Sequence, residues 1–232
     1  MQYQIEMIGY DAILIRFTDA DNTQLLPLIY RLNQQLNNAV DLVPVIIDII
    51  PSYQTLLISF NIIKIEPHQL INKIHVYVKQ VLNSHTPASH QAFTTTADLI
   101  ILPVCYHQSL APDLAALSQH SALSIDAIIN IHSSTIYSCY AIGFMPNFAY
   151  LGDVDKRIQI PRHAKPKAQV VAGSVGIADN QTAIYPKASP GGWQIIGQSP
   201  AALDTLAVGC QVKFNQISLD EFNHYHQKDQ AS

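Results

Sequence analysis

Residues that could perform chemistry are concentrated between positions 141 and 200 of this sequence. Seven of its nine glycines and its only tryptophan lie there. Glycine permits positive φ angles and proline fixes φ, so we expect short strands joined by loops of defined shape in this stretch. Polar and aromatic side chains on such loops are typical of a binding or catalytic surface.

Arg162 is the first candidate for catalysis. It lies in the segment IPRHAKP, between two prolines and just before Lys165 and Lys167. Its guanidinium could recognise a carboxylate or a phosphate, or it could anchor the loop through a salt bridge. The two lysines would attract an anion only as point charges, because an ammonium group lacks the bidentate geometry of arginine.

A second set of candidates, for substrate or anion binding, surrounds the glycine-rich turns. Backbone N–H groups beside Ser174 could form an anion-binding nest, although plain turn geometry also explains the glycines. Tyr185 and Trp193 could belong to a core or could wall a pocket. A serine hydrolase is excluded for Ser189, because the chain has no GxSxG elbow and no obvious base beside this serine. The complete set is Gly173, Ser174, Gly176, Tyr185, Ser189, Gly191, Gly192 and Trp193.

His132 is the second candidate for catalysis. It ends a helical face that Ile125, Ile128 and Ile129 make apolar. The imidazole could transfer a proton during a reaction, or it could be a hydrogen-bonded histidine of the core. The position at the end of an apolar helix face favours the core interpretation over proton transfer.

Four side chains predict a partner interface: Phe144, Met145, Phe148 and Tyr150. Packing beneath a barrel could account for some of them. An interface accounts for them better, because exposed aromatic residues near an arginine are frequent anchors of protein partners.

Composition limits the possible partners. The 232 residues carry a formal net charge of −4, only 13% are charged, and lysine and arginine form no block. We therefore expect no nucleic-acid and no membrane partner. The first residues lack a basic region before an apolar core, and no apolar run could cross a bilayer, which predicts a soluble, cytoplasmic protein.

Cysteine and histidine spacing predicts no metal site in this chain. Cys105, Cys139 and Cys210 are far apart and show no CxxC spacing, so we expect buried thiols without a disulfide framework. The ten histidines are scattered, and no metal or nucleotide motif is present.

The hydrophobic pattern predicts two domains. Strands at 3–8, 12–17, 43–50 and 55–63, with helices at 23–36 and from Pro67, predict a ferredoxin-like α+β domain over residues 1–84. Residues 85–97 are expected to be a linker, because the hydrophobic periodicity ends there and small and polar residues predominate. Residues 98–217 are expected to form a mainly-β barrel, followed by a tail at 218–232 that is a weak helix or disorder.

Two short helices are expected near the start of this second domain. The first covers 112–117, with Asp113 placed to interact with its positive end. The second follows Ser124, which has the side chain of an N-cap residue.

Several longer segments of the sequence resemble those of the family of 5-oxoprolinase B subunits. This family is also called the KipI family and was long labelled allophanate hydrolase subunit 1. These segments are LPVCY at 102–106, IGFMPNFAYLG at 142–152, IPR at 160–162, AGSVGIA at 172–178 and IYPKASPGGWQIIG at 184–197. They span most of residues 99–200. Asn147 stands where glycine is commonest in this family, and asparagine tolerates the left-handed conformation that such a turn needs.

This resemblance implies a cyclophilin-like barrel after the ferredoxin-like domain. It also implies an enzyme component that works together with a C subunit, built from cyclophilin-like barrels, and with an A subunit. The assembled enzyme would use ATP, with Mg²⁺, to open the lactam of 5-oxoproline to L-glutamate. Phosphorylation of the lactam oxygen needs positioned cations and N–H donors, which Arg162, the turn at 173–176 and the pair Gly191 and Gly192 could supply.

Two other functions are consistent with the resemblance. The chain could be a KipI-like regulatory protein that binds and inhibits a histidine kinase. A prolyl isomerase is a weaker alternative, because it rests on the barrel fold alone.

Overall fold

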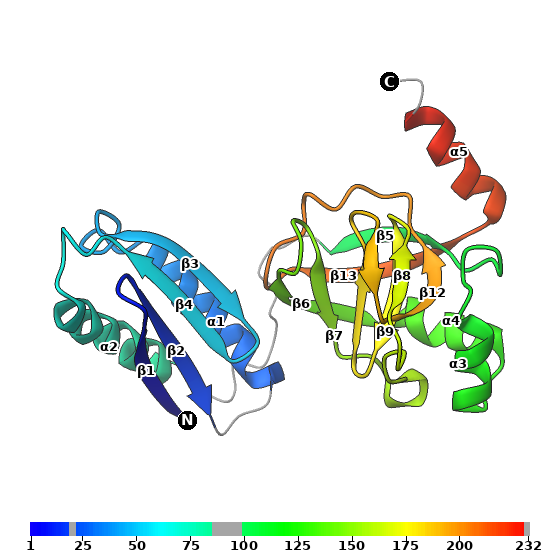
Figure 1. The fold of residues 1–232 in the computed structure, drawn as a ribbon. Helices are drawn as coiled ribbons and strands as arrows, with labels where there is room; N and C mark the ends of the chain where they lie inside the picture. Colours follow the sequence, from blue (N-terminus) through cyan, green and yellow to red (C-terminus); the bar gives the residue numbers. More distant parts are fainter. Residues whose placement is uncertain (19–21, 85–98, 230–232) are drawn as a thin grey trace. The chain divides into compact units, whose positions relative to one another are not determined.

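The computed structural model describes residues 1–18, 22–84 and 99–229 (Figure 1). The chain divides into two compact units, Met1–Thr96 and Ala97–Ser232. The predicted linker at 85–97 lies outside the described residues.

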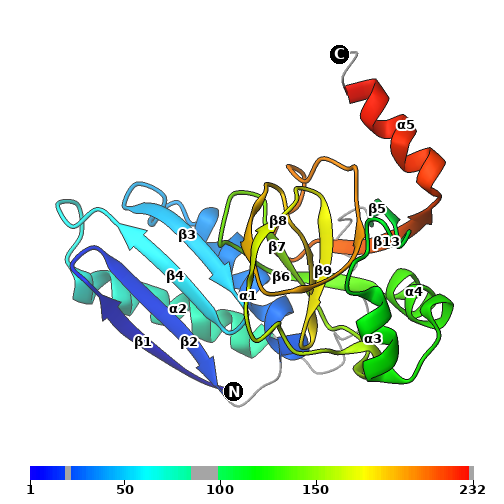
Figure 2. The same ribbon diagram turned by 45° about the vertical axis from the view of Figure 1, so that its right-hand side comes forward.

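The first unit is a four-stranded antiparallel sheet with two helices. Its elements are β1 (Gln2–Ile8), β2 (Ala12–Thr18), α1 (Asn22–Asn37), β3 (Ile46–Ser52), β4 (Thr55–Phe60) and α2 (Pro67–Ser84). The strand order is β1-β2-β4-β3, and every pairing is antiparallel. Both helices cover the same face of the sheet (Figures 1 and 2).

Alternation of apolar residues creates the core of this unit. Ile13, Ile15 and Phe17 on β2 point toward the helices and are fully buried. The leucines of α1 recur at helical spacing and meet them. The strand and helix pattern agrees with the sequence prediction, but β3 begins at Ile46 rather than residue 43, because residues 40–45 form turns. The ferredoxin-like assignment stays a prediction.

The second unit is a closed barrel of seven strands. These are β5 (Ile100–Cys105), β6 (Ile136–Ile142), β7 (Ala149–Gly152), β9 (Ser174–Ala178), β10 (Gln181–Ile184), β12 (Gln194–Gln198) and β13 (Gln211–Ile217). Their order is β6-β13-β5-β12-β9-β10-β7, and pairing of β7 with β6 closes the ring. Only the β5 and β13 pair is parallel, so the barrel is mixed. A mainly-β barrel is confirmed, and its cyclophilin-like classification stays a prediction.

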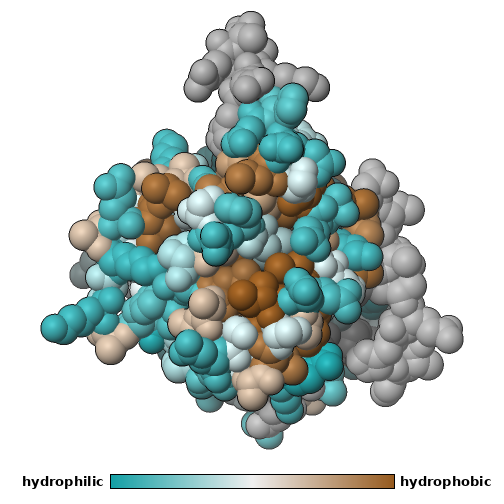
Figure 3. Space-filling view, turned by 90° about the vertical axis from the view of Figure 1, so that its right-hand side faces the viewer, coloured by the Kyte–Doolittle hydropathy of each residue, from teal (hydrophilic) through white to brown (hydrophobic). Residues whose placement is uncertain are grey.

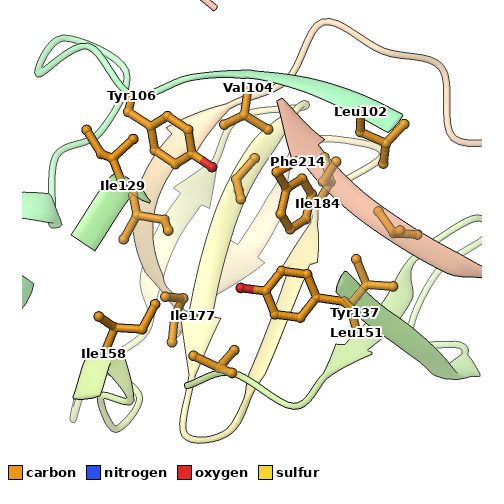
Figure 4. Close-up of a cluster of buried hydrophobic side chains, with 14 of the residues drawn as sticks. Leu102, Val104, Tyr106, Ile129, Tyr137, Leu151, Ile158, Ile177, Ile184 and Phe214 are labelled. Carbon is orange, nitrogen blue, oxygen red and sulfur yellow. The ribbon is translucent and has the colours of Figure 1, made fainter. Parts of the chain in front are cut away.

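Side chains fill the barrel. Val104, Ile177 and Phe214 come from three different strands and meet in the interior (Figure 4). Helices α3 (Leu114–Ser121) and α4 (Ile125–Ser134) pack on this core through Leu117 and Ile128, both fully buried. Ser124 caps α4 as expected, because its Oγ accepts a hydrogen bond from the Ala127 N–H. The barrel interior is therefore a packed core.

A two-stranded ribbon, a 3₁₀ turn and a helix of the described residues lie outside the ring of seven strands. A two-stranded ribbon joins β8 (Lys167–Val170) to β11 (Ser189–Gly191), and a short 3₁₀ turn covers Lys156–Ile158. Helix α5 (Leu219–Asp229) begins with a reciprocal cap between Ser218 and Glu221, and Phe222 anchors it against the barrel. The first turns of the predicted tail are thus an anchored helix.

The surface of the barrel unit is mixed. Viewed from the side of α3 and α4, an apolar area is bordered by hydrophilic residues (Figure 3). Among the helices described, none has the length and apolar character needed to span a membrane.

The absence of a side chain at Gly173 lets its backbone lie close to the carbonyl group of Ser199. The φ of Gly173 is +79°, and an added Cβ would lie 2.4 Å from the carbonyl oxygen of Ser199. We expect Gly173→Ala to lower the unfolding free energy by roughly 3 kcal/mol, since left-handed strain and a backbone clash add. Urea titration followed by the fluorescence of Trp193 measures this loss. Gly143→Ala is the matched control, because nothing lies within 4 Å of its added Cβ. Equal losses of unfolding free energy in both variants would contradict the close contact between Gly173 and Ser199.

Candidate functional site

A pocket of about 270 Å³ opens on the barrel unit. It gathers residues from the turn after β6, the loop before β8 and the segment that joins β11 to β12. Its lining is Phe144, Phe148, Tyr150, Arg162, Pro166, Tyr185, Pro190, Gly191, Gly192 and Trp193. Most of the residues predicted for binding and for a partner interface are thus brought to one place.

Aromatic rings form the inner wall of this pocket, which we name the aromatic pocket. The buried ring of Phe148 is central, with centroid distances of 4.9 Å to Tyr150, 5.3 Å to Tyr185 and 5.6 Å to Trp193. All three contacts are edge-to-face, the geometry that ring quadrupoles favour. The inner wall is consequently a closely packed and largely apolar cluster of rings.

Gly191 lets Tyr185 occupy its place in this wall. A Cβ at position 191 would lie 2.4 Å from the Tyr185 hydroxyl oxygen. Burial raises the pKa of Tyr185, while a hydrogen bond from the Trp193 backbone and the charge of Arg162 partly oppose that rise. The phenol is therefore neutral at physiological pH.

Arg162 supplies the positive charge at the pocket. Its Cζ atom lies 5.6 Å from the centroid of the Trp193 ring, within cation–π distance. No carboxylate in the described part of the chain forms an ion pair with this guanidinium. The loop-anchoring salt bridge considered from the sequence is therefore absent there, and the guanidinium is available to an anion.

Backbone and side-chain hydrogen bonds hold the loop on both sides of Arg162. The His163 N–H donates to the Gly192 carbonyl at 2.7 Å. The Gln194 side-chain amide donates to the Pro161 carbonyl at 3.0 Å. Arg162 thus projects from a backbone that is fixed to the pocket's own wall.

Unpaired buried polar atoms gather around the same segments. In the described residues, four buried side-chain polar atoms lack a hydrogen bond, and two of them are Ser189 Oγ and Gln194 Oε1. A third, His163 Nε2, lies 3.2 Å from Asp113 Oδ2 and so has an ion-pair partner. Native proteins leave few such atoms unpaired, so a cluster of them indicates a place where water or a ligand completes the hydrogen bonding.

Lys167 does not act as a free anion ligand. Its ammonium binds the carboxylate of Asp113, a residue 54 positions earlier. Asp113 is the N-cap residue of α3, near the positive end of the helix as expected, but its side chain makes no capping hydrogen bond. Lys165 remains exposed.

The turn at 173–176 does not provide the predicted anion nest. The Gly173 N–H donates to the Tyr185 carbonyl at 2.7 Å, and the Ser174 N–H donates to the Val171 carbonyl at 3.2 Å. Gly176 lies within β9, where an added Cβ would sit 3.0 Å from Cβ of Trp193. None of these three residues lines the aromatic pocket. Turn geometry explains Gly173, and close packing of the strand against Trp193 explains Gly176.

His132 lies in the core of the barrel unit, as the interpretation of a hydrogen-bonded core histidine predicts, and its imidazole is completely buried. Its ring stacks on Phe214 at 4.6 Å, and both ring nitrogens are hydrogen-bonded. Thr182 donates its hydroxyl proton to the Gly176 carbonyl, so its oxygen accepts from His132 Nε2 at 3.0 Å. Nδ1 then accepts from the Tyr106 hydroxyl at 2.7 Å. Burial lowers the pKa of His132 to about 3, so this is a neutral core histidine.

The four predicted interface residues differ in exposure. Phe144 is 63% exposed and has a φ of 71°, whereas Phe148 is only 1% exposed. Met145 and Tyr150 are half-buried. Phe148 therefore supports the pocket from within, and the role of the others in a partner interface stays a prediction.

Comparison with known proteins identifies the family. The family model described as "Carboxyltransferase domain, subdomain C and D" matches residues 3–205. A Bacillus subtilis (strain 168) protein, named as the B subunit of 5-oxoprolinase, is 32% identical over 238 residues, which cover 98% of each chain. The chain belongs to the family of 5-oxoprolinase B subunits.

Solved structures share the fold of this member of the 5-oxoprolinase B-subunit family. The crystal structure of TTHA0988 has a TM-score of 0.73 at 26% identity, covering 89% of this chain and 40% of the other. The Kluyveromyces lactis urea amidolyase has a TM-score of 0.70 at 17% identity, covering 96% of this chain and 15% of the other, and this likeness shows the fold alone. The chain therefore corresponds to a part of these longer proteins.

The buried His132 predicts a pH dependence of stability. At pH 7 its imidazole is neutral in the folded state and mostly neutral in the unfolded state. In the unfolded chain this imidazole binds a proton below about pH 6.5, whereas in the folded chain it stays neutral down to about pH 3. The free energy of unfolding therefore falls as the pH falls through this range. Between pH 7 and pH 5 we expect this group to lower the unfolding free energy by roughly 2 kcal/mol.

Urea titrations at both pH values, followed by Trp193 fluorescence, measure this loss. His132→Gln serves as the comparison, because it removes the titrating group and keeps a polar side chain. The pH dependence should be weaker in this variant by the stated amount. An identical pH dependence in both proteins would show that His132 is not held neutral.

Proposed function

We propose that this chain is the B subunit of an ATP-dependent 5-oxoprolinase that hydrolyses 5-oxoproline to L-glutamate together with an A and a C subunit. The name of the Bacillus subtilis relative supports a place in a system of several subunits. The observation that carries the proposal is the guanidinium of Arg162, which stands over the aromatic pocket and pairs with no carboxylate among the described residues.

The chemistry of this pocket suits 5-oxoproline. That molecule is a five-membered lactam ring with one carboxylate. Arg162 can hold the carboxylate through two parallel hydrogen bonds, while the ring packs on the aromatic wall. A pocket of about 270 Å³ lies just below the range typical of drug-sized ligands, which fits a small cyclic amide.

ATP fits the described residues of this chain poorly. The aromatic pocket presents the single guanidinium of Arg162, and the N–H donors of Gly173 and Ser174 are already engaged. A triphosphate requires several cations and free backbone donors. We therefore assign substrate holding to this chain, and ATP and Mg²⁺ to the other subunits.

In this proposal, Arg162 orients the lactam and keeps its carboxylate charge-paired. The closely packed rings exclude water from one side of the substrate, which strengthens the charge-assisted hydrogen bonds. The lactam carbonyl then faces the open mouth of the pocket, where the partner protein meets it. Phe144, exposed at that mouth, is the proposed contact for the C subunit.

Inhibition of a histidine kinase stays the second candidate function. The exposed aromatic ring of Phe144 favours a protein partner at the pocket mouth, and a kinase could supply it as well as the C subunit could. Autophosphorylation of the kinase with and without this chain separates the two: unchanged autophosphorylation removes the regulatory function.

Arg162→Ala tests the proposed function. In the assembled enzyme, 5-oxoproline-dependent ATP hydrolysis should lose kcat/KM on the order of 100-fold, because the substrate carboxylate loses its charged partner. Arg162→Lys should retain part of the activity, since a point charge replaces the bidentate group.

Arg157→Ala is the matched control for this substitution. Arg157 is exposed, pairs with Asp155 and lies outside the aromatic pocket, so its loss should leave turnover unchanged. Wild-type kcat/KM in Arg162→Ala would remove Arg162 from the site.

A further inference from the structure

Asp113 is a buried carboxylate whose side-chain partners all lie on segments that also carry residues of the aromatic pocket. It is only 8% exposed. Its Oδ2 atom accepts a hydrogen bond from the Ile195 N–H at 2.6 Å and one from the Lys167 ammonium. His163 Nε2 lies 3.2 Å from the same oxygen, within ion-pair distance but without hydrogen-bond geometry. One oxygen atom therefore gathers three partners.

These partners belong to the segments that carry Arg162 and Trp193. His163 and Lys167 are one and five residues after Arg162, and Ile195 is two residues after Trp193. Asp113 thus ties the loop of the guanidinium to the strand of the ring beneath it. The Asp113 N–H adds to this link by donating to the Ile195 carbonyl at 2.9 Å.

The carboxylate is charged in this environment. Burial alone would raise the pKa of Asp113, but the hydrogen bonds from Lys167 and the Ile195 N–H outweigh burial and lower it. The side chain makes no hydrogen bond to cap α3. A buried charge must be paired, and here the partners all belong to the segments that carry Arg162 and Trp193.

We propose that Asp113 is a positioning residue, which fixes the loop 161–167 so that the Arg162 guanidinium stands over Trp193 before the substrate arrives. The effect of Asp113 on enzyme kinetics rests on the proposed function, in which Arg162 binds the carboxylate of the substrate. A pre-organised arginine loses less conformational entropy on binding, so substrate affinity is the quantity that Asp113 raises.

A double-mutant cycle tests the coupling. In the assembled enzyme, Asp113→Asn should raise KM for 5-oxoproline about tenfold and change kcat less than twofold, because the position of Arg162 affects binding. In the Arg162→Ala background, Asp113→Asn should have no further effect on KM. Additive effects of the two substitutions would overturn the proposal, since a purely structural role would act equally in both backgrounds.

A second measurement does not depend on turnover. Hydrogen exchange of the His163 amide, which donates to the Gly192 carbonyl, should become at least tenfold faster in Asp113→Asn. Asp126→Asn is the matched control, because Asp126 is an exposed aspartate on α4, and it should leave this amide unchanged. Unaltered protection of His163 in Asp113→Asn would overturn the proposal even if the chain had another enzymatic function.

Lys167→Met provides a milder variant if Asp113→Asn fails to fold. It keeps the aliphatic stem of Lys167 and removes one of the donors to Asp113. We expect the same direction of change in His163 exchange, with a smaller magnitude, while the urea unfolding transition stays cooperative. Wild-type exchange in this variant would count against the link between Asp113 and the loop.

Discussion

The closure of the β-barrel is the constraint on which the rest of the second unit depends. Pairing of β7 with both β6 and β10 leaves no free edge in the ring of seven strands. The ribbon of β8 and β11 is outside that ring, so its residues are free to build a surface feature. The aromatic pocket forms where this ribbon and its flanking loops lie over a core that is already packed.

Electrostatics give the pocket its chemical character. The chain carries a net negative charge, yet Arg162 stands over aromatic rings with no ion-pair partner among the described residues. Lys167, the neighbouring cation of the loop, is neutralised by Asp113. One guanidinium is thus left to a ligand, and the aromatic wall lowers the local dielectric and strengthens its attraction for an anion.

Much of this arrangement could be predicted from the sequence, because glycine and proline dictate the backbone locally. Gly191 and Gly192 were expected to act together with Arg162, and they line the same pocket as Arg162 and Trp193. The helical face that ends at His132 was also predictable from its spacing. Complete burial of His132 was not, because it depends on Thr182 and Phe214, which follow 50 and more positions later.

Long-range hydrogen bonds account for the other differences. The N–H groups at Gly173 and Ser174 are available in the sequence pattern, but the Tyr185 and Val171 carbonyls accept from them in the fold. Asp113 has the position of a helix-end residue, and only the tertiary structure brings Lys167 to it. Local patterns thus marked many of the residues that line the aromatic pocket, whereas the partners of each polar group were set by the tertiary fold.

A fluorescence titration of the isolated chain tests the central claim most directly, since Trp193 is its only tryptophan and lies beneath the Arg162 guanidinium. We predict a saturable change with 5-oxoproline and a much weaker one with 2-pyrrolidinone, the same lactam without the carboxylate. Equal responses to the two compounds, or no response to either, would contradict the claim that this pocket receives a carboxylate at Arg162.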